Sequence, residues 1–119
     1  MVRKSLILSK NIRICSSYFA KGSGLMFRFP GNDFAYIFDF PSVRRVAITM
    51  WFVFISIDLI SLDSSGVIIE LRKGLKPFGS YFLKHSLKTF IELPSGSIAS
   101  NNIKLGMSVS WSKNELVIF

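Results

Sequence analysis

The sequence predicts a mainly β protein, a small single-domain β-sandwich or jelly-roll-like barrel with one or two short helices. Three observations lead to this fold class. Apolar and polar residues alternate with a period of two in several segments, β-branched and aromatic residues fill these segments, and turn-forming residues separate them at short intervals. The 119 residues, half of them hydrophobic, suit one domain with one core, so we expect residues 1–119 to form a single domain.

The clearest alternation runs from Phe34 to Phe40, where aromatic residues at every second position share one face of a predicted strand. We expect this strand to end at Pro41, because proline cannot donate to a sheet ladder. Two largely apolar strands are predicted next, over Val46–Phe52 and Phe54–Leu62. Asp63 to Gly66 then form a tight turn, since both residue types favour turn conformations.

The second half of the chain continues the pattern. Further strands are predicted over Val67–Arg72, Thr89–Leu93, Met107–Trp111 and Leu116–Phe119. In the first of these we expect Ile69 and Leu71 to face the core and Glu70 to face away. The segment Gly74–Ser86 is expected to be irregular, with a helical turn that Ser80 could cap. Other short helical segments are predicted at Ser16–Lys21 and around Ile98.

The net charge of +8 and a pI near 10 permit binding to nucleic acid or to an anionic membrane. The basic residues are spread along the chain without a dense cluster, which favours a solvated basic surface. Two segments nevertheless carry only positive charge. The first 30 residues hold six basic and no acidic side chains, and residues 71–91 hold five basic and none acidic. The sequence leaves open whether these segments meet in one patch.

No segment predicts a membrane or secretory element. The uncharged run Val46–Ile57 has 12 residues, whereas a spanning helix needs about 20, and the apolar run near the N-terminus is shorter than a signal-peptide core. Cys15 is the only cysteine, so no internal disulfide can form, and with His85 as the only histidine the common zinc sites are excluded by count. We expect a cytoplasmic protein with no membrane contact, no metal and no cofactor.

Among the polar residues, Asp58 and Glu92 are the candidate site residues. Asp58 shares a strand face with Ile60 and Leu62, and Glu92 shares one with Phe90. A carboxylate in apolar surroundings must be hydrogen-bonded or paired, or its pKa rises. Each is therefore either a site acid beside a pocket or a structural acceptor of backbone N–H bonds, and the structural interpretation of Asp58 is favoured.

The remaining candidates carry less chemistry. The sequence contains no P-loop, no G-x-S-x-G and no dinucleotide fingerprint, so no catalytic residue is predicted. His85 lies between Lys84 and Lys88 and is expected to be exposed. Of the aromatic residues, Trp111 and Phe54 are expected in the core, while the environment of Phe78 stays open.

The order of several short motifs resembles the uncharacterised family called domain of unknown function 192, from about residue 18 to residue 111. The matching segments are Gly24-Leu25-Met26-Phe27, Met50–Phe54 leading to Ser56-Ile57-Asp58, Leu62-Asp63 with Gly66-Val67, Lys76-Pro77-Phe78, Glu92–Gly96, and Gly106–Val109. Ser56 and Met107 depart from the family pattern, which has proline and aspartate there. The resemblance implies a small jelly-roll β-sandwich and implies no established activity.

These observations favour a non-enzymatic module that binds a small molecule or a peptide end. Its predicted pocket lies beside Asp58 and Glu92 and is rimmed by Met26, Trp51 and Phe78. Two alternatives stay open. One is a basic nucleic-acid-binding protein, whose binding would weaken steeply with salt. The other is an enzyme that uses the two acids as general acid and base, and it is the least favoured because no plausible nucleophile is present.

Overall fold

The computed structural model describes residues 6–15, 33–50 and 53–119. The described strands, in chain order, are β1 (Leu6–Ser9), β2 (Ile12–Cys15), β3 (Ala35–Arg44), β4 (Ala47–Thr49), β5 (Ile57–Leu62), β6 (Ile68–Leu75), β7 (Ser80–Phe82), β8 (Leu87–Pro94), β9 (Val109–Trp111) and β10 (Leu116–Ile118). One short helix, α2 (Ser97–Ser100), lies between β8 and β9. The predicted mainly β class is confirmed.

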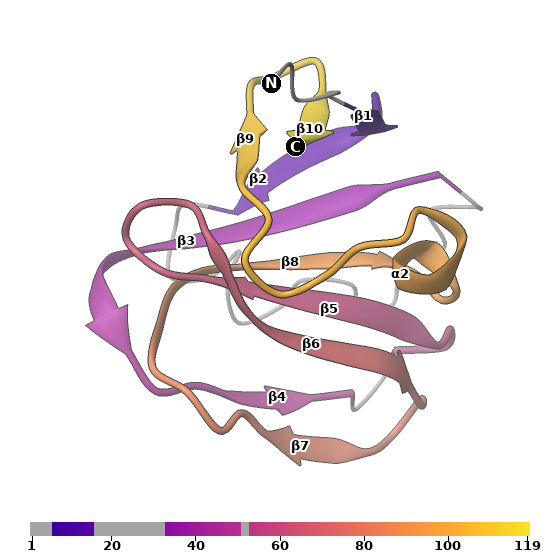
Figure 1. The fold of residues 1–119 in the computed structure, drawn as a ribbon. Helices are drawn as coiled ribbons and strands as arrows, with labels where there is room; N and C mark the ends of the chain where they lie inside the picture. The colour runs from indigo at the N-terminus through magenta and orange to yellow at the C-terminus, as the bar shows by residue number, and fades with distance from the viewer. Residues whose placement is uncertain (1–5, 16–32, 51–52) are drawn as a thin grey trace.

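A five-stranded sheet in the order β2-β3-β8-β5-β6 forms the middle of the molecule. The three-stranded sheet β1-β10-β9 lies on one side of it, and the pair β4-β7 lies on the other (Figure 1). Within the described residues the three sheets are open, so the arrangement is a layered sandwich and not a closed barrel. No helix in the described ranges has the length and apolarity needed to cross a bilayer.

Two hydrophobic cores fill the spaces between these layers. The first core lies on the β4-β7 side and consists of Phe34, Tyr36, Phe38, Phe40, Ile48, Met50, Val53, Ile57, Leu59, Leu75, Leu83, Leu87 and Phe90. The second core lies on the side of β9, β10 and α2 and consists of Ala35, Ile37, Ile60, Leu62, Ile68, Ile91, Leu93, Ile98, Ile103, Val109, Leu116 and Ile118. The four alternating aromatics of the segment 34–40 all belong to the first core, as predicted from their period.

Some predicted elements were wrong or incomplete. β7 lies in the segment expected to be irregular, and it forms because Ser80–Phe82 pairs with β4. β1 and β2 were not predicted, since four residues are too few to show a period-two pattern. β5 begins at Ile57, so Phe54 lies outside the strand and is 42% exposed. The expectation that Phe54 is a core residue was therefore wrong, whereas Trp111 packs against the second core. The segment Ser16–Lys21 lies outside the described residues.

Candidate functional site

Asp58 is a buried carboxylate whose two oxygens are both occupied by backbone donors. Its side chain lies on the face of β5 that points to the second core, and the residue is 1% exposed. Oδ1 accepts the N–H of Gly74 at 2.9 Å, and Oδ2 accepts the N–H groups of Gly96 at 3.1 Å and Ile98 at 2.9 Å. Asp58 thus ties the end of β6 and the start of α2 to the central sheet.

Two of these three donors are glycines in left-handed backbone. The φ angles are 60° at Gly74 and 93° at Gly96, a region that residues with a Cβ adopt at a cost. The glycines turn their amide groups toward the carboxylate. Asp58 is thus a structural acceptor of backbone N–H groups, the role that the sequence analysis favoured for it.

Glu92 has the opposite environment. The residue is 8% exposed, and no described residue donates to its buried Oε2. Burial of the carboxyl group raises the pKa of Glu92 to about 8. The group is therefore mostly protonated at neutral pH. The protonated carboxyl group of Glu92 offers one O–H donor and one carbonyl acceptor. Burial, and no neighbouring charge, causes the shift of its pKa.

The central sheet separates the two acids. In the antiparallel pairing of β5 with β8, Asp58 is opposite Leu93, and Leu59 is opposite Glu92. Directly paired residues point to the same face and successive residues to opposite faces. Asp58 therefore faces the second core with Leu93, while Glu92 faces the first core with Leu59. Because the sheet lies between them, the acids share no pocket and cannot act as an acid–base pair on one substrate.

Phe78 lies at the end of the molecule where β6 has just finished. It is 48% exposed and its φ is +64°, which is unusual for a bulky residue. Its N–H donates to Met50 O at 2.7 Å, and Met50 N–H donates to Gly79 O at 2.7 Å. The rings of Phe54 and Phe78 meet edge to face, with centroids 5.8 Å apart. The predicted rim residues Met26 and Trp51 lie outside the described residues.

Sheet register places Phe78 and Glu92 at the same end of the sandwich. Leu75, three residues before Phe78, pairs with Ile57. Ile57 in turn pairs with Pro94, two residues after Glu92. Ile57, Leu75 and Met50 all belong to the first core, the side that Glu92 also faces. The predicted pairing of Phe78 with Glu92 in one region is thus compatible with the fold, whereas Asp58 lies on the other side of the sheet.

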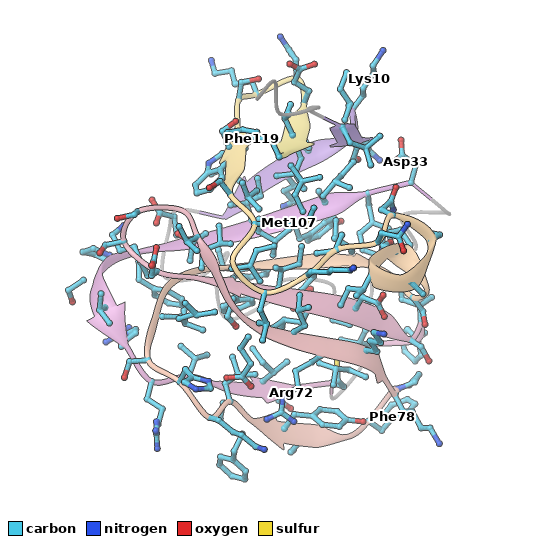
Figure 2. The ribbon with its side chains drawn as sticks, in the orientation of Figure 1. Lys10, Asp33, Arg72, Phe78, Met107 and Phe119 are labelled. Atoms are coloured by element: carbon cyan, nitrogen blue, oxygen red, sulfur yellow. The ribbon has the colours of Figure 1, made fainter. Side chains whose placement is uncertain are left out.

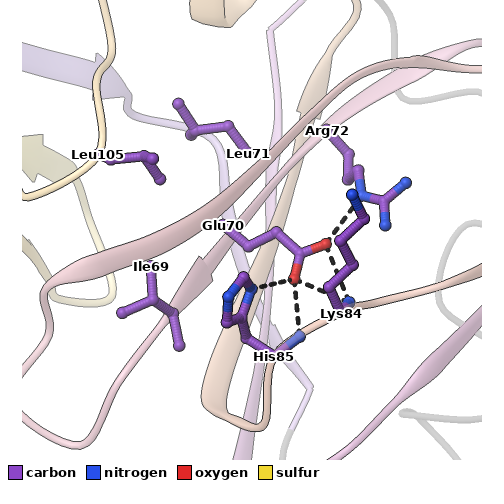
Figure 3. Close-up of a pocket in the computed structure, with 7 residues that line it drawn as sticks. All are labelled: Ile69, Glu70, Leu71, Arg72, Lys84, His85 and Leu105. Carbon is purple, nitrogen blue, oxygen red and sulfur yellow. Dashed lines mark hydrogen bonds and ion pairs between the residues drawn. The ribbon is translucent and has the colours of Figure 1, made fainter.

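A second polar cluster was missed by the sequence analysis. Glu70 on β6 accepts four groups: Arg72 Nε at 2.8 Å, His85 Nδ1 at 3.0 Å, and the N–H groups of Lys84 and His85, each at 3.0 Å (Figure 3). Burial acts to raise the pKa of Glu70, but these hydrogen bonds outweigh it and lower the pKa to about 2. Glu70 therefore clamps the β7–β8 connection onto β6 as a carboxylate.

An irregularity in β6 explains why this cluster was missed. Leu62 pairs with Ile68, and Ser61 pairs with Glu70, so one extra residue lies between the two pairs. As a result Ile69 packs against the first core and Leu71 against the second. The expectation that both face one way and Glu70 the other was wrong. No feature of the local sequence identifies the extra residue.

A surface pocket of about 370 Å³ adjoins this cluster at the outer edge of β6. It is lined by Ile69, Glu70, Leu71, Arg72, Lys84, His85 and Leu105 (Figure 3). His85 is exposed, as predicted, and its side chain is 60% accessible. Because Nδ1 faces a carboxylate, that nitrogen carries the proton, and Nε2 is the nitrogen left for other partners. Among the described residues, no group of three potential ligands could hold a metal ion.

The comparisons with known proteins agree with the motif order. The model of an uncharacterised family, domain of unknown function 192, matches residues 3–111. A UPF0127 protein of Thermococcus sibiricus is 32% identical over 94% of this chain and 73% of its own length. A UPF0127 protein of Pyrococcus horikoshii is 32% identical over 91% of this chain and 93% of its own.

Two solved structures share the fold. One, from Sinorhizobium meliloti and assigned only provisionally as a transcription regulator, has a TM-score of 0.75 and covers 80% of this chain and 76% of that one. The other, a protein of unknown function from Novosphingobium aromaticivorans, has a TM-score of 0.77 and covers 84% of this chain and 74% of that one. Both are 20% identical to this chain, which establishes the fold alone. By its family match over residues 3–111 and its UPF0127 relatives, the chain belongs to the uncharacterised family called domain of unknown function 192.

Proposed function

We propose that this chain is a non-enzymatic binding module that holds a small molecule or a peptide end against the carboxyl group of Glu92. The observation that carries the proposal is the buried Oε2 atom without a hydrogen-bond partner among the described residues. Leaving such a group unpaired costs about 1–3 kcal/mol, which a ligand that pairs with it would offset. Because the unpaired atom lowers the stability of the fold, we assign Glu92 to binding in this proposal.

The chemistry of Glu92 limits the ligand. A protonated carboxyl group donates one hydrogen bond and accepts another beside it, so it complements a neutral group with the same pair, such as a primary amide. An amino group, as at the N-terminus of a peptide, would instead take its proton and leave an ion pair. Another buried polar atom that has no partner among the described residues is Ser61 Oγ, and it faces the same core, since Ser61 pairs with Phe90.

Phe78 supplies the exposed part of the proposed site. Its strained φ and its ring contact with Phe54 hold an aromatic surface at the end of the sheet where Glu92 lies. In this proposal Met26 and Trp51, which lie outside the described residues, complete the rim, because both belong to the family motifs. Asp58 has a supporting role, because it orders Gly74 and Gly96 from the other face.

The experiment uses nuclear magnetic resonance to follow the backbone amides of the full chain. The probes are free amino acids, amino-acid amides, and tripeptides with free or blocked ends. We expect one class to shift amides around Glu92 and Phe78, and we expect Glu92→Leu to weaken its binding at least tenfold. Glu115→Gln is the control, since it changes an acid outside both cores. Equal binding by Glu92→Leu, or no shift with any probe class, would overturn the proposal.

The proposal includes a cellular location for the protein and needs no bound group. A cytoplasmic location suits a chain whose single cysteine, Cys15, leaves no internal disulfide. Recognition of a peptide end or a small metabolite-like molecule at Glu92 requires neither a cofactor nor a metal. The proposed site residues are therefore Glu92, Phe78, Met26 and Trp51, with Asp58 in support.

A further inference from the structure

Phe82 is the most exposed large hydrophobic residue in the described part of the chain, at 78%. It ends β7, a strand of the outermost layer of the sandwich (Figure 1). Its neighbour Tyr81 packs against the first core, so alternation along the strand directs Phe82 away from the core. Ala47, the residue paired with Phe82 on β4, is also exposed. The ring therefore contributes little to folding.

Two arginines are held at the β7–β8 connection by hydrogen bonds to main-chain carbonyl groups. Arg72 Nη2 donates to Phe82 O at 2.9 Å, and Arg45 Nη2 donates to Lys84 O at 2.6 Å. The arginines come from β6 and from the segment after β3, so they approach the β7–β8 connection from two elements. Lys84, whose carbonyl group Arg45 contacts, follows Phe82 by two residues. The positive charges are thus held beside Phe82 by hydrogen bonds to the backbone, which lowers the entropy lost when they bind an anion.

Glu70, the acid of this cluster, already has a cationic partner. Glu70 is 7% exposed as a side chain and is ion-paired with Arg72 at 2.8 Å. Its negative charge is directed inward, toward the amides of Lys84 and His85. Arg45 and Lys84 therefore leave the surface positive. The pocket of about 370 Å³ is lined by Arg72, Lys84 and His85 of this surface, and it has room for part of a ligand beside the apolar Leu105.

We propose that the surface formed by Arg45, Arg72, Phe82, Lys84 and His85 binds single-stranded nucleic acid, with a base stacked on Phe82 and backbone phosphates held by the cationic side chains. Exposed aromatic rings among arginine and lysine side chains are what such binding requires, because every base has a stacking face and every nucleotide carries a phosphate. This surface contains none of the residues assigned to the Glu92 site, so the two proposals can fail separately.

The test is fluorescence anisotropy with labelled oligothymidine and oligouridine of about 15 nucleotides, the upper range for one small domain. We expect the full chain to bind both oligomers and to lose affinity steeply between about 50 and 200 mM salt. Phe82→Ser should weaken binding by roughly tenfold, as expected for loss of one stacked base. Arg45→Ser should lower both the affinity and the slope of its salt dependence, the latter by about 1.

Matched controls separate this surface from the overall positive charge. Phe119→Ser removes an exposed ring at the opposite end of the molecule from Arg72 (Figure 2). Lys113→Ser removes one charge in the β9–β10 turn. Both variants should bind within about twofold of the unsubstituted chain. The proposal is overturned if Phe82→Ser behaves like Phe119→Ser, if the oligomers do not bind at low salt, or if polyglutamate binds as tightly as oligothymidine with the same dependence on Phe82.

Discussion

Asp58 on β5 and Glu92 on β8 lie one register position apart and face opposite layers of the sandwich. Asp58 accepts three backbone N–H groups, whereas Oε2 of Glu92 has no partner among the described residues. Two carboxyl groups on adjacent strands thus have different physical roles. Asp58 organises the glycine turns at Gly74 and Gly96, and Glu92 carries an unmet capacity for hydrogen bonding that points into the first core.

Replacement of Asp58 by asparagine should destabilise the fold. The amide retains one acceptor oxygen but turns an NH₂ group toward backbone donors, so charge-assisted hydrogen bonds are lost. We expect the free energy of unfolding to fall by about 2–3 kcal/mol, measured by urea denaturation. Asp39→Asn is the matched control, since Asp39 is 42% exposed and pairs with Lys88, and it should cost less than about 1 kcal/mol. Equal effects of both substitutions would contradict the role of Asp58.

Glu92→Leu should have the opposite effect on stability. Leucine removes a buried carboxyl group whose Oε2 has no partner among the described residues, and it fills similar space with apolar atoms. We expect the free energy of unfolding to stay the same or to rise by up to about 2 kcal/mol at neutral pH, while ligand binding is lost. A decrease of several kcal/mol in urea denaturation would show that Glu92 has a structural partner.

Glu92 also predicts a pH dependence of stability with a definite sign. Its pKa rises from the ordinary 4.5 to about 8 in the folded chain, so the folded state holds a proton that the unfolded state releases between these values. The free energy of unfolding should therefore fall as pH increases from about 4.5 to about 8. The comparison is between the unsubstituted chain and Glu92→Leu, in which this decrease should disappear. A decrease of the same size in the variant would assign it to another group.

Glu70 should make the stability of the fold depend on pH in the acidic range. Its pKa is lowered to about 2, so the stability that its carboxylate contributes is present above the ordinary value of 4.5 and is lost as pH falls toward 2. Glu70→Gln should reproduce this loss at neutral pH, at about 1–3 kcal/mol. Hydrogen exchange tests whether the loss of stability is located at the β7–β8 connection. The amides of Lys84 and His85 should exchange faster in the variant, and unchanged protection would contradict the role of Glu70 in holding this connection.

Phe78→Gly tests whether the strained aromatic residue serves folding or binding. Glycine adopts a φ of +64° without the cost of about 1–2 kcal/mol that a bulky side chain bears there, and this gain offsets the lost ring contact with Phe54. Thermal unfolding should therefore occur at the same temperature or higher, while binding at the Glu92 site weakens. A clear decrease in the melting temperature would mean that Phe78 is needed for the fold.

Period-two patterns were sufficient to predict the mainly β class and the inward aromatic face of residues 34–40. The strength of the pattern also explains an omission, since the three-residue strand β7 becomes visible only through its pairing with β4, which lies inside the predicted strand Val46–Phe52. For Asp58 and Glu92, the face of each acid on its own strand was predictable. Whether the two converge depends on the register between β5 and β8, which no local pattern specifies. The Glu70 cluster joins residues 14 and 15 positions apart across an irregular strand, so it too depends on tertiary structure.

The carboxyl group of Glu92 can be observed directly. A pH titration of its side-chain carbon by nuclear magnetic resonance, with Glu92→Gln to assign the signal, measures whether the group is a buried, unpaired acid. We predict a pKa of about 8, because burial of the carboxyl group raises its pKa. A midpoint near the ordinary 4.5 would mean that the carboxyl group is solvated or paired, and it would contradict the account of Glu92 as the core of a binding site.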